Sequence, residues 1–402
     1  MTSRFSSSLC LYAVSNTRHY GARTLLASQL HFANRIDDRS YASQQQPRSK
    51  KPDPATATAN AIKHEYSAKS ALTTIESGQN ADPVNPPRST LPAPLKLPER
   101  NESSTVFIYW FNIGRAYGSF YKEGIRAVWY NYKAARALRD RIQKSAAKDG
   151  IEAAQRGLIT RSEWQMLHRN NHDIGKLPFF GLLVLVFGEW LPLLVPFMPG
   201  VVPGTCRIPK QVFGMRRQAE ERRRVSFRQG VCELTEEQIP DERVAFGGRP
   251  AVRAEWPMLD ATYVRSLLAK LRDDQLHHLS SALTLHSRTW DRIQLPPPAF
   301  LLRRNLTRHL QGLAVDDNLF LKTAAKLPPN TTVTSKLSPV ELENACADRG
   351  LEVLGKKETE LRTSLSAWLQ RQQEDQGRGR AVLTMLFRRP NAWDTKTASM
   401  KQ

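Results

Sequence analysis

Residues 177–199 read LPFFGLLVLVFGEWLPLLVPFMP, and they belong to a run of 30 residues, 177–206, whose one charged side chain is Glu189. A helix of about 20 apolar residues spans the hydrocarbon core of a bilayer. The run therefore predicts a single transmembrane segment over residues 177–202. The alternative is a buried hairpin of a protein core, which would be broken at Pro192 and Pro196.

The basic residues beside this run predict its orientation. Three Lys and Arg residues lie in 161–176, whereas seven lie in 207–224. The excess of positive charge marks the cytoplasmic side of a membrane protein, and the mitochondrial matrix corresponds to the bacterial cytoplasm. If the membrane is a mitochondrial one, we therefore expect the C-terminal side of the segment to face the matrix.

Glu189 is the most informative single residue of the run. A carboxylate at membrane depth is costly, so it indicates a function. Glu189 either carries a proton or a cation, or it lies near the end of a short helix and reaches water or a neighbouring chain. Because one span cannot enclose a path alone, transport would require a homo-oligomer.

The N-terminal part has the composition of a targeting sequence. Residues 1–36 contain four Arg, many Ser, Thr and Ala, and no Asp or Glu, as in a mitochondrial transit peptide. Arg39–Ser43 resembles a processing-peptidase pattern, which predicts a transit peptide over 1–41 with cleavage after Tyr41; a generic disordered tail is the alternative. Pro, Ser, Thr and Ala dominate residues 42–104, which predicts a disordered linker. Residues 391–402 are expected to form a disordered tail.

The charge of the chain points to anionic partners. The 402 residues carry a formal charge of +21, and without residues 1–41 the chain keeps 54 Lys and Arg against 36 Asp and Glu, or +18. RNA, a ribosome or an anionic lipid surface would suit such a chain. The four cysteines are scattered without C-x-x-C or metal-ligand spacing, which indicates free thiols in a reducing compartment.

Apolar spacing predicts helices on both sides of the run and no strand pattern. Residues 105–176 are expected to form amphipathic helices with a basic face, suited to a membrane surface, a partner helix or their own domain. Thr160–Glu163 and Ser338–Glu341 have the form of capping boxes, and Gly350 is the expected stop after the second. Residues 203–390 are therefore predicted to be an all-α domain.

No enzyme motif is found. The sequence lacks G-x-G-x-x-G, a P-loop, H-E-x-x-H and a nucleophile elbow, so we expect no catalytic residue, cofactor, metal or small-molecule substrate. His277 and His278 are adjacent and are interpreted as helix-surface residues rather than a metal pair. The pairs Asp273-Asp274 and Asp316-Asp317 are interpreted as helix caps, with a short helix at about 306–313 running into the second pair.

A series of short motifs carries a family resemblance. In chain order they are Tyr121–Trp129, Lys133–Arg136, Leu158–Glu163, Lys176–Phe179, Pro199–Thr205, Pro298–Arg303, Asp316-Asp317, Leu342–Leu351 and Leu361–Leu369. Over about residues 115–390 this order resembles the leucine-zipper/EF-hand transmembrane family of mitochondrial inner-membrane proteins. Neither an EF-hand calcium loop nor the long coiled coil of that family is found in this sequence.

The resemblance implies a fold and a function. It implies a single inner-membrane span followed by a 14-3-3-like helical domain in the matrix that binds mitochondrial ribosomes, through rRNA and ribosomal proteins. It further implies support for membrane insertion of newly made respiratory-chain proteins and for ion homeostasis, with inner-membrane lipid as a second partner. The alternative is a K⁺/H⁺ or divalent cation/H⁺ exchanger that acts as an oligomer through Glu189.

Basic side chains after the span are the candidate ribosome contacts, because Lys and Arg bind phosphates irrespective of base sequence. A run that is solvated or faces lipid headgroups is the alternative interpretation. The candidates are Arg207, Lys210, Arg216, Arg217, Arg222, Arg223 and Arg224, followed by Arg303 and Arg304.

Overall fold

A computed structural model describes six parts of the chain: residues 82–95, 97–98, 106–187, 200–230, 233–239 and 256–389. All of them belong to the second of two units, 1–55 and 56–402. Within these parts every regular element is a helix and no strand occurs, so the all-α prediction is confirmed there. The predicted transit peptide with its cleavage at Tyr41, residues 391–402 and Glu189 lie outside the described residues.

Among the described residues, two α-helices precede the predicted membrane segment and a third enters it: α4 (Val106–Lys144), α5 (Gly150–Gln155) and α6 (Arg161–Phe187). The capping box before α6 forms as predicted. The Thr160 N–H donates to the Glu163 carboxylate at 2.9 Å, and the Glu163 N–H donates to the Thr160 hydroxyl at 3.4 Å. The helix then continues through Pro178 into the apolar run.

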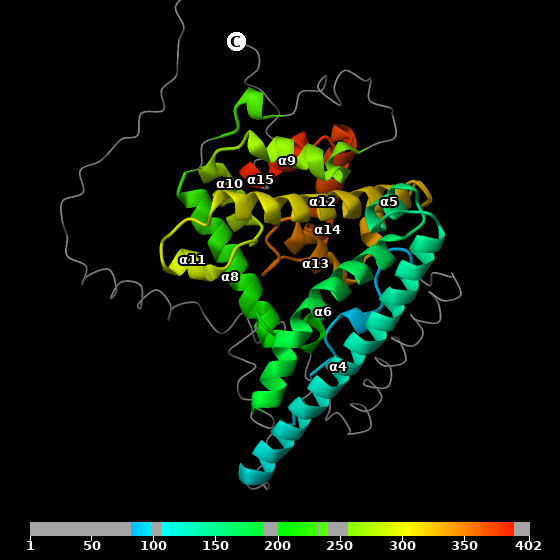
Figure 1. The fold of residues 1–402 in the computed structure, drawn as a ribbon, viewed down its shortest axis with the longest axis vertical. Coiled ribbons are helices and arrows are strands. Elements are labelled where there is room, and N and C mark those ends of the chain that lie inside the picture. The colour runs from blue at the N-terminus through cyan, green and yellow to red at the C-terminus, as the bar shows by residue number, and fades with distance from the viewer. Residues whose placement is uncertain are drawn as a thin grey trace, which may run out of the picture. The chain divides into compact units, whose positions relative to one another are not determined.

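Helices α4 and α6 pack side by side in opposite directions (Figure 1). In the first half of α4, Phe120 and Tyr121 share a small buried cluster with Phe180 and Leu183 from the end of α6. Gly124 of α4 is required here, because a Cβ at that position would lie 2.7 Å from the Cys206 sulfur. The 3₁₀ turn Gly204–Cys206 therefore brings the end of the apolar run back against α4.

Part of the predicted disordered linker is ordered. In the segment 82–95, Val84 is buried and its carbonyl accepts a hydrogen bond from Arg161 Nη1 at 2.7 Å. The Ser89 hydroxyl donates to the Asn131 side chain at 2.7 Å. The prediction of disorder was wrong for this segment, because hydrogen bonds to α4 and α6 and the burial of Val84 and Ala93 hold it in place.

In the described residues after the apolar run there are eight α-helices, and α12 (Ala299–Ala324) is central to their packing (Figure 1). The predicted short helix at 306–313 forms the middle of α12, which is much longer. Its apolar side and the facing sides of its neighbours form one core with the second half of α4 and the first half of α6. The helices are α8 (Pro209–Arg228), α9 (Ala261–Ala269), α10 (Asp273–Ala282), α11 (Arg288–Arg292), α12 (Ala299–Ala324), α13 (Pro339–Asp348), α14 (Glu358–Asp375) and α15 (Arg380–Phe387).

Helix α13 begins and ends where the sequence predicts. The Ser338 hydroxyl accepts the Glu341 N–H at 3.4 Å, and Pro339 occupies the first helical position. The helix stops at Asp348, and Gly350 has φ +75°, the left-handed conformation that glycine tolerates best.

A network of buried charges lies at the centre of the core. Arg349 pairs with Asp316 at 2.8 Å and with Asp317, while Arg161 of α6 pairs with Asp316 at 2.9 Å. The indole N–H of Trp368 donates to Asp317 Oδ2 at 3.0 Å. These contacts join α6, α12, α13 and α14.

The interpretation of Asp316 and Asp317 as helix caps was therefore wrong. Both lie within α12, where a carboxylate is stable because guanidinium groups from other helices neutralise it. Burial would raise the pKa of Asp316, but Arg161 and Arg349 outweigh that effect and hold the pKa below its usual value.

The paired ends of α4 and α6 expose large apolar side chains. They are Phe107, Trp110 and Phe111 at the start of α4, and Phe179, Leu182, Leu185 and Val186 at the end of α6. Because the two helices are antiparallel, both sets lie toward the same end of the pair, and α6 ends directly before residues 188–199 of the apolar run.

None of the helices in the described parts is both long and apolar enough to cross a bilayer. The predicted segment 177–202 is described at 177–187 and 200–202 only.

Candidate functional site

Helix α8 carries most of the candidate basic residues. Pro209 occupies its first position, and the Gln211 side chain accepts the Ile208 N–H at 3.0 Å, which fixes the start of the helix. The helix packs against α10 through Ser226, whose hydroxyl lies 2.7 Å from His278 Nδ1. One side of the basic run is therefore turned into the domain.

Four of the candidate arginines bind other parts of the same domain. Arg216 pairs with Glu343 of α13, and Arg222 pairs with Asp291 of α11. Arg224 binds Glu352 through two hydrogen bonds of 2.9 and 3.1 Å. Arg223 is buried and donates from Nε to the Ala282 carbonyl at 3.0 Å. These contacts engage the four side chains within the domain and hold α8 in place.

The other candidates differ in their exposure. Lys210, Arg217 and Arg304 are exposed, and no ion pair joins them to any described residue. Arg303 lies 3.6 Å from Asp273 of α10. Arg207 is partly buried beside the 3₁₀ turn, and burial lowers its pKa. Lys210, Arg217 and Arg304 are thus the candidates available to an anionic surface.

A cavity of about 420 Å³ lies where α8 meets the turn after α13 and helices α14 and α15. Seven of its lining residues are Lys or Arg and two are Glu. Two backbone N–H groups of the turn, those of Val353 and Leu354, donate to Glu220 of α8 at 2.8 and 2.9 Å. The wall of the cavity is thereby fixed to α8.

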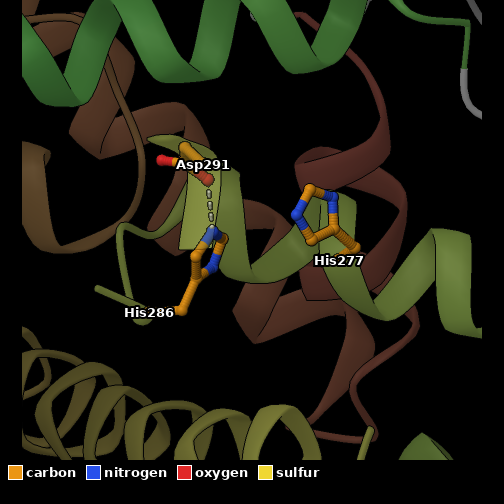
Figure 2. A group of neighbouring side chains, drawn as sticks. All are labelled: His277, His286 and Asp291. Carbon is orange, nitrogen blue, oxygen red and sulfur yellow. Dashed lines mark hydrogen bonds and ion pairs between the residues drawn. The ribbon is translucent and has the colours of Figure 1, made fainter. Parts of the chain in front are cut away.

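Apart from the cavity, two histidines and an aspartate form a polar group (Figure 2). His277 of α10, His286 and Asp291 each offer a ligand atom, and these atoms lie within 4.8 Å of one another. His286 Nε2 lies 3.1 Å from Asp291 Oδ1. Burial lowers the pKa of both histidines, so at neutral pH they have the uncharged form that binds metal ions.

Imidazole and carboxylate ligands in such a group suit Zn²⁺. However, Arg222 already pairs with Asp291, and it donates to the His286 carbonyl at 2.9 Å. A guanidinium at this position repels a second cation. The group is therefore best described as an arginine-held polar network between α8, α10 and α11.

The interpretation of His277 and His278 as surface residues was wrong for His278, which is 1% exposed. His278 Nε2 lies 3.3 Å from the Leu386 carbonyl of α15, and its ring meets Phe227 of α8 edge-on. His286 and Asp291 were not singled out from the sequence, because their spacing from His277 matches no ligand motif.

Comparison with known proteins gives two family matches. Residues 262–386 match the family described as "LETM1-like, RBD", and residues 104–241 match the family described as "Pentamidine resistance factor domain". The chain therefore contains a LETM1-like domain over residues 262–386, and the resemblance recognised from the sequence motifs is confirmed for that domain. The motif residues Asp316, Asp317, Arg349 and Trp368 form the buried network described above.

A curated relative is named "Mitochondrial proton/calcium exchanger protein" and comes from Drosophila melanogaster. It is 24% identical over 226 residues, which make up 52% of this chain and 21% of the relative. The chain thus matches about a fifth of the length of that mitochondrial protein, whose name describes an exchanger rather than an enzyme. No solved structure matches the chain.

Proposed function

We propose that this chain is a mitochondrial inner-membrane protein whose helical domain binds mitochondrial ribosomes. It thereby supports membrane insertion of newly made respiratory-chain proteins and ion homeostasis, without catalysing a reaction. One observation carries the proposal: a LETM1-like domain with exposed basic side chains belongs to the same chain as a helix pair whose end is apolar and exposed.

The membrane part of the proposal rests on the end of the α4–α6 pair. Trp110, Leu182 and Leu185 are more than half exposed, at 64%, 60% and 82%. Large exposed apolar side chains gathered toward one end of a helix pair are typical of contact with lipid or another protein. In this proposal the end of α6 continues into a single span over 177–202, and the C-terminal domain faces the matrix.

The ribosome part rests on the basic side chains that have no ion pair among the described residues. Lys210, Arg217 and Arg304 can each neutralise an rRNA phosphate, and every such contact releases counterions. Because Arg216, Arg222, Arg223 and Arg224 are held by the domain, we assign them to its stability rather than to ribosome contact.

Sedimentation through a density gradient tests the ribosome proposal. In detergent extracts of mitochondria at low salt, the tagged chain should co-migrate with ribosomes and should dissociate as salt is raised. The double variant Lys210→Glu/Arg217→Glu should lose most of this binding. Arg265→Glu is the matched control, since Arg265 is an exposed arginine of α9. If the wild-type chain never co-migrates with ribosomes at low salt, the proposal fails.

Carbonate extraction tests the membrane proposal independently. An integral protein stays in the membrane pellet at alkaline pH, whereas a peripheral protein is released. Protease protection of tags on the two termini then reports the orientation. Release of the wild-type chain into the supernatant would contradict the proposed span.

A second candidate function is cation/H⁺ exchange by an oligomer. The printed name of the relative favours it, and Glu189 is the candidate carboxylate. Purified chain in liposomes should then support cation-driven proton flux that the Glu189→Gln variant lacks. Equal flux in both proteins would remove Glu189 from the mechanism.

A further inference from the structure

We propose that the cavity between α8, α14 and α15 is a binding site for a small phosphorylated molecule that carries an apolar group. This site is separate from the exposed side chains proposed for ribosome binding. Neither Lys210, Arg217 nor Arg304 lines the cavity, so the two proposals stand or fail independently.

The charges around the cavity do not cancel. Arg349 is engaged by Asp316 and Asp317, Arg224 is engaged by Glu352, and Lys356 pairs with Glu360 at 3.2 Å. Both acidic lining residues are thereby neutralised. The lining still contains Arg223, Arg228 and Arg389, which leaves an excess of positive charge that favours an anionic ligand.

Arg223 is the residue that most directly indicates an anionic ligand. Its side chain is 7% exposed, and Nε is bound to the Ala282 carbonyl. Its Nη1, in contrast, is buried and has no hydrogen-bond partner within the described parts of the chain. A buried guanidinium nitrogen without a partner is costly. Because Arg223 lines the cavity, a bound ligand whose oxygen reached Nη1 would remove that cost. Burial lowers the pKa of Arg223 to about 10, which still leaves it charged at neutral pH.

Phosphate is an anion that fits these donors. Arginines of α8 and of the two residues that follow α15 line the cavity. The planar N–H groups of arginine match the oxygens of a phosphate and give strong, charge-assisted hydrogen bonds. Arg389 is further oriented by the ring of Phe227, which lies 5.7 Å from its guanidinium carbon.

The remaining walls indicate that the ligand has an apolar part. Phe227, Leu351, Leu361, Met385 and Leu386 also line the cavity. A volume of about 420 Å³ lies within the range of small-molecule sites, about 300–1,000 Å³. The cavity therefore suits a phosphate ester of an apolar or aromatic group, and it is too small for a folded partner.

Phenyl phosphate is the probe for this proposal, titrated calorimetrically into the full chain in detergent. Saturable binding is expected, and neutral benzyl alcohol should bind far more weakly. Loss of one charge-assisted contact should weaken binding roughly 10- to 100-fold in Arg223→Gln. Arg228→Gln and Arg389→Gln lie at exposed positions and test the site without altering a buried residue; each should weaken binding several-fold, whereas Arg265→Gln should not.

A second arm distinguishes the source of the phosphate. If the natural ligand is a lipid headgroup, vesicles containing phosphatidic acid should bind the chain and phenyl phosphate should compete with them. If the ligand is a free ester, phenyl phosphate should bind without affecting vesicle association. The proposal is overturned if the wild-type chain shows no saturable binding of phenyl phosphate, or if Arg223→Gln, Arg228→Gln and Arg389→Gln all bind it as the wild type does.

Discussion

The buried charge network gives the most quantitative prediction. The substitution Arg349→Met keeps the side-chain volume but removes the ion pairs to Asp316 and Asp317. Asp316 retains Arg161, and Asp317 retains only the hydrogen bond from Trp368. Because Asp317 is fully buried, its carboxylate is left without a compensating charge.

The magnitude follows from the burial of all three partners. Breaking a buried ion pair by removing one side costs about 3–5 kcal/mol. For a domain of about 150–250 residues, 1 kcal/mol corresponds to about 2–4 °C in the melting temperature. We therefore expect Arg349→Met to lower the melting temperature by about 6–20 °C, measured by circular dichroism of the full chain in detergent.

Two further variants test the reasoning. Asp317→Asn in the Arg349→Met background removes the stranded charge but keeps an acceptor for Trp368, so it should recover a substantial part of the loss. Arg265→Met, at an exposed position of α9, should change the melting temperature by less than about 2 °C. The reasoning is refuted if Arg349→Met melts within about 2 °C of the wild type, or if the double variant is no more stable than the single one.

Other predictions concern single sites. Burial lowers the pKa of His278, so the stability that the uncharged imidazole contributes is present above about pH 6.5 and is lost at lower pH. Between pH 7 and pH 5 the melting temperature of His278→Asn should therefore fall less than that of the wild type, and equal falls would contradict this. A Cβ at Gly377, where φ is +67°, would lie 2.4 Å from the ring of Trp256. Gly377→Ala should therefore lower the free energy of unfolding by more than the about 1–2 kcal/mol that a left-handed conformation costs a residue with a side chain. Gly355 has φ +72° and open space around it, so Gly355→Ala should lower the free energy of unfolding by about 1–2 kcal/mol only. Because Arg222 repels a cation at the group in Figure 2, Arg222→Ala should bind Zn²⁺ at least about tenfold more tightly than the wild type in competition with a chromogenic chelator; unchanged affinity would contradict this explanation.

Local signals in the sequence were sufficient for several parts of the fold. The capping residues Thr160 and Ser338 and the stop at Gly350 act within a single helical turn, so their sequence pattern contains the whole interaction. The apolar stripes around Leu342 and Leu365 likewise follow the helical period and are buried as expected.

Features that depend on distant partners were not predictable in the same way. Asp317 and Arg349 are 32 residues apart, and nothing local distinguishes an aspartate at a helix end from one that is neutralised inside a core. The basic run of α8 gave no indication that four of its arginines would bind α11, α13 and neighbouring segments. The cavity is formed by residues from Arg223 to Arg389, so only the folded chain reveals it.

Flotation of proteoliposomes tests the central proposal most directly, because it requires the membrane span and the ribosome contact together. The purified chain is reconstituted into liposomes and mixed with mitochondrial ribosomes at low salt before centrifugation through a density gradient. Ribosomes should float with wild-type proteoliposomes, and they should sediment when salt is raised or when Lys210→Glu/Arg217→Glu is used. Ribosomes that sediment to the bottom in the presence of wild-type proteoliposomes at low salt would contradict the proposal.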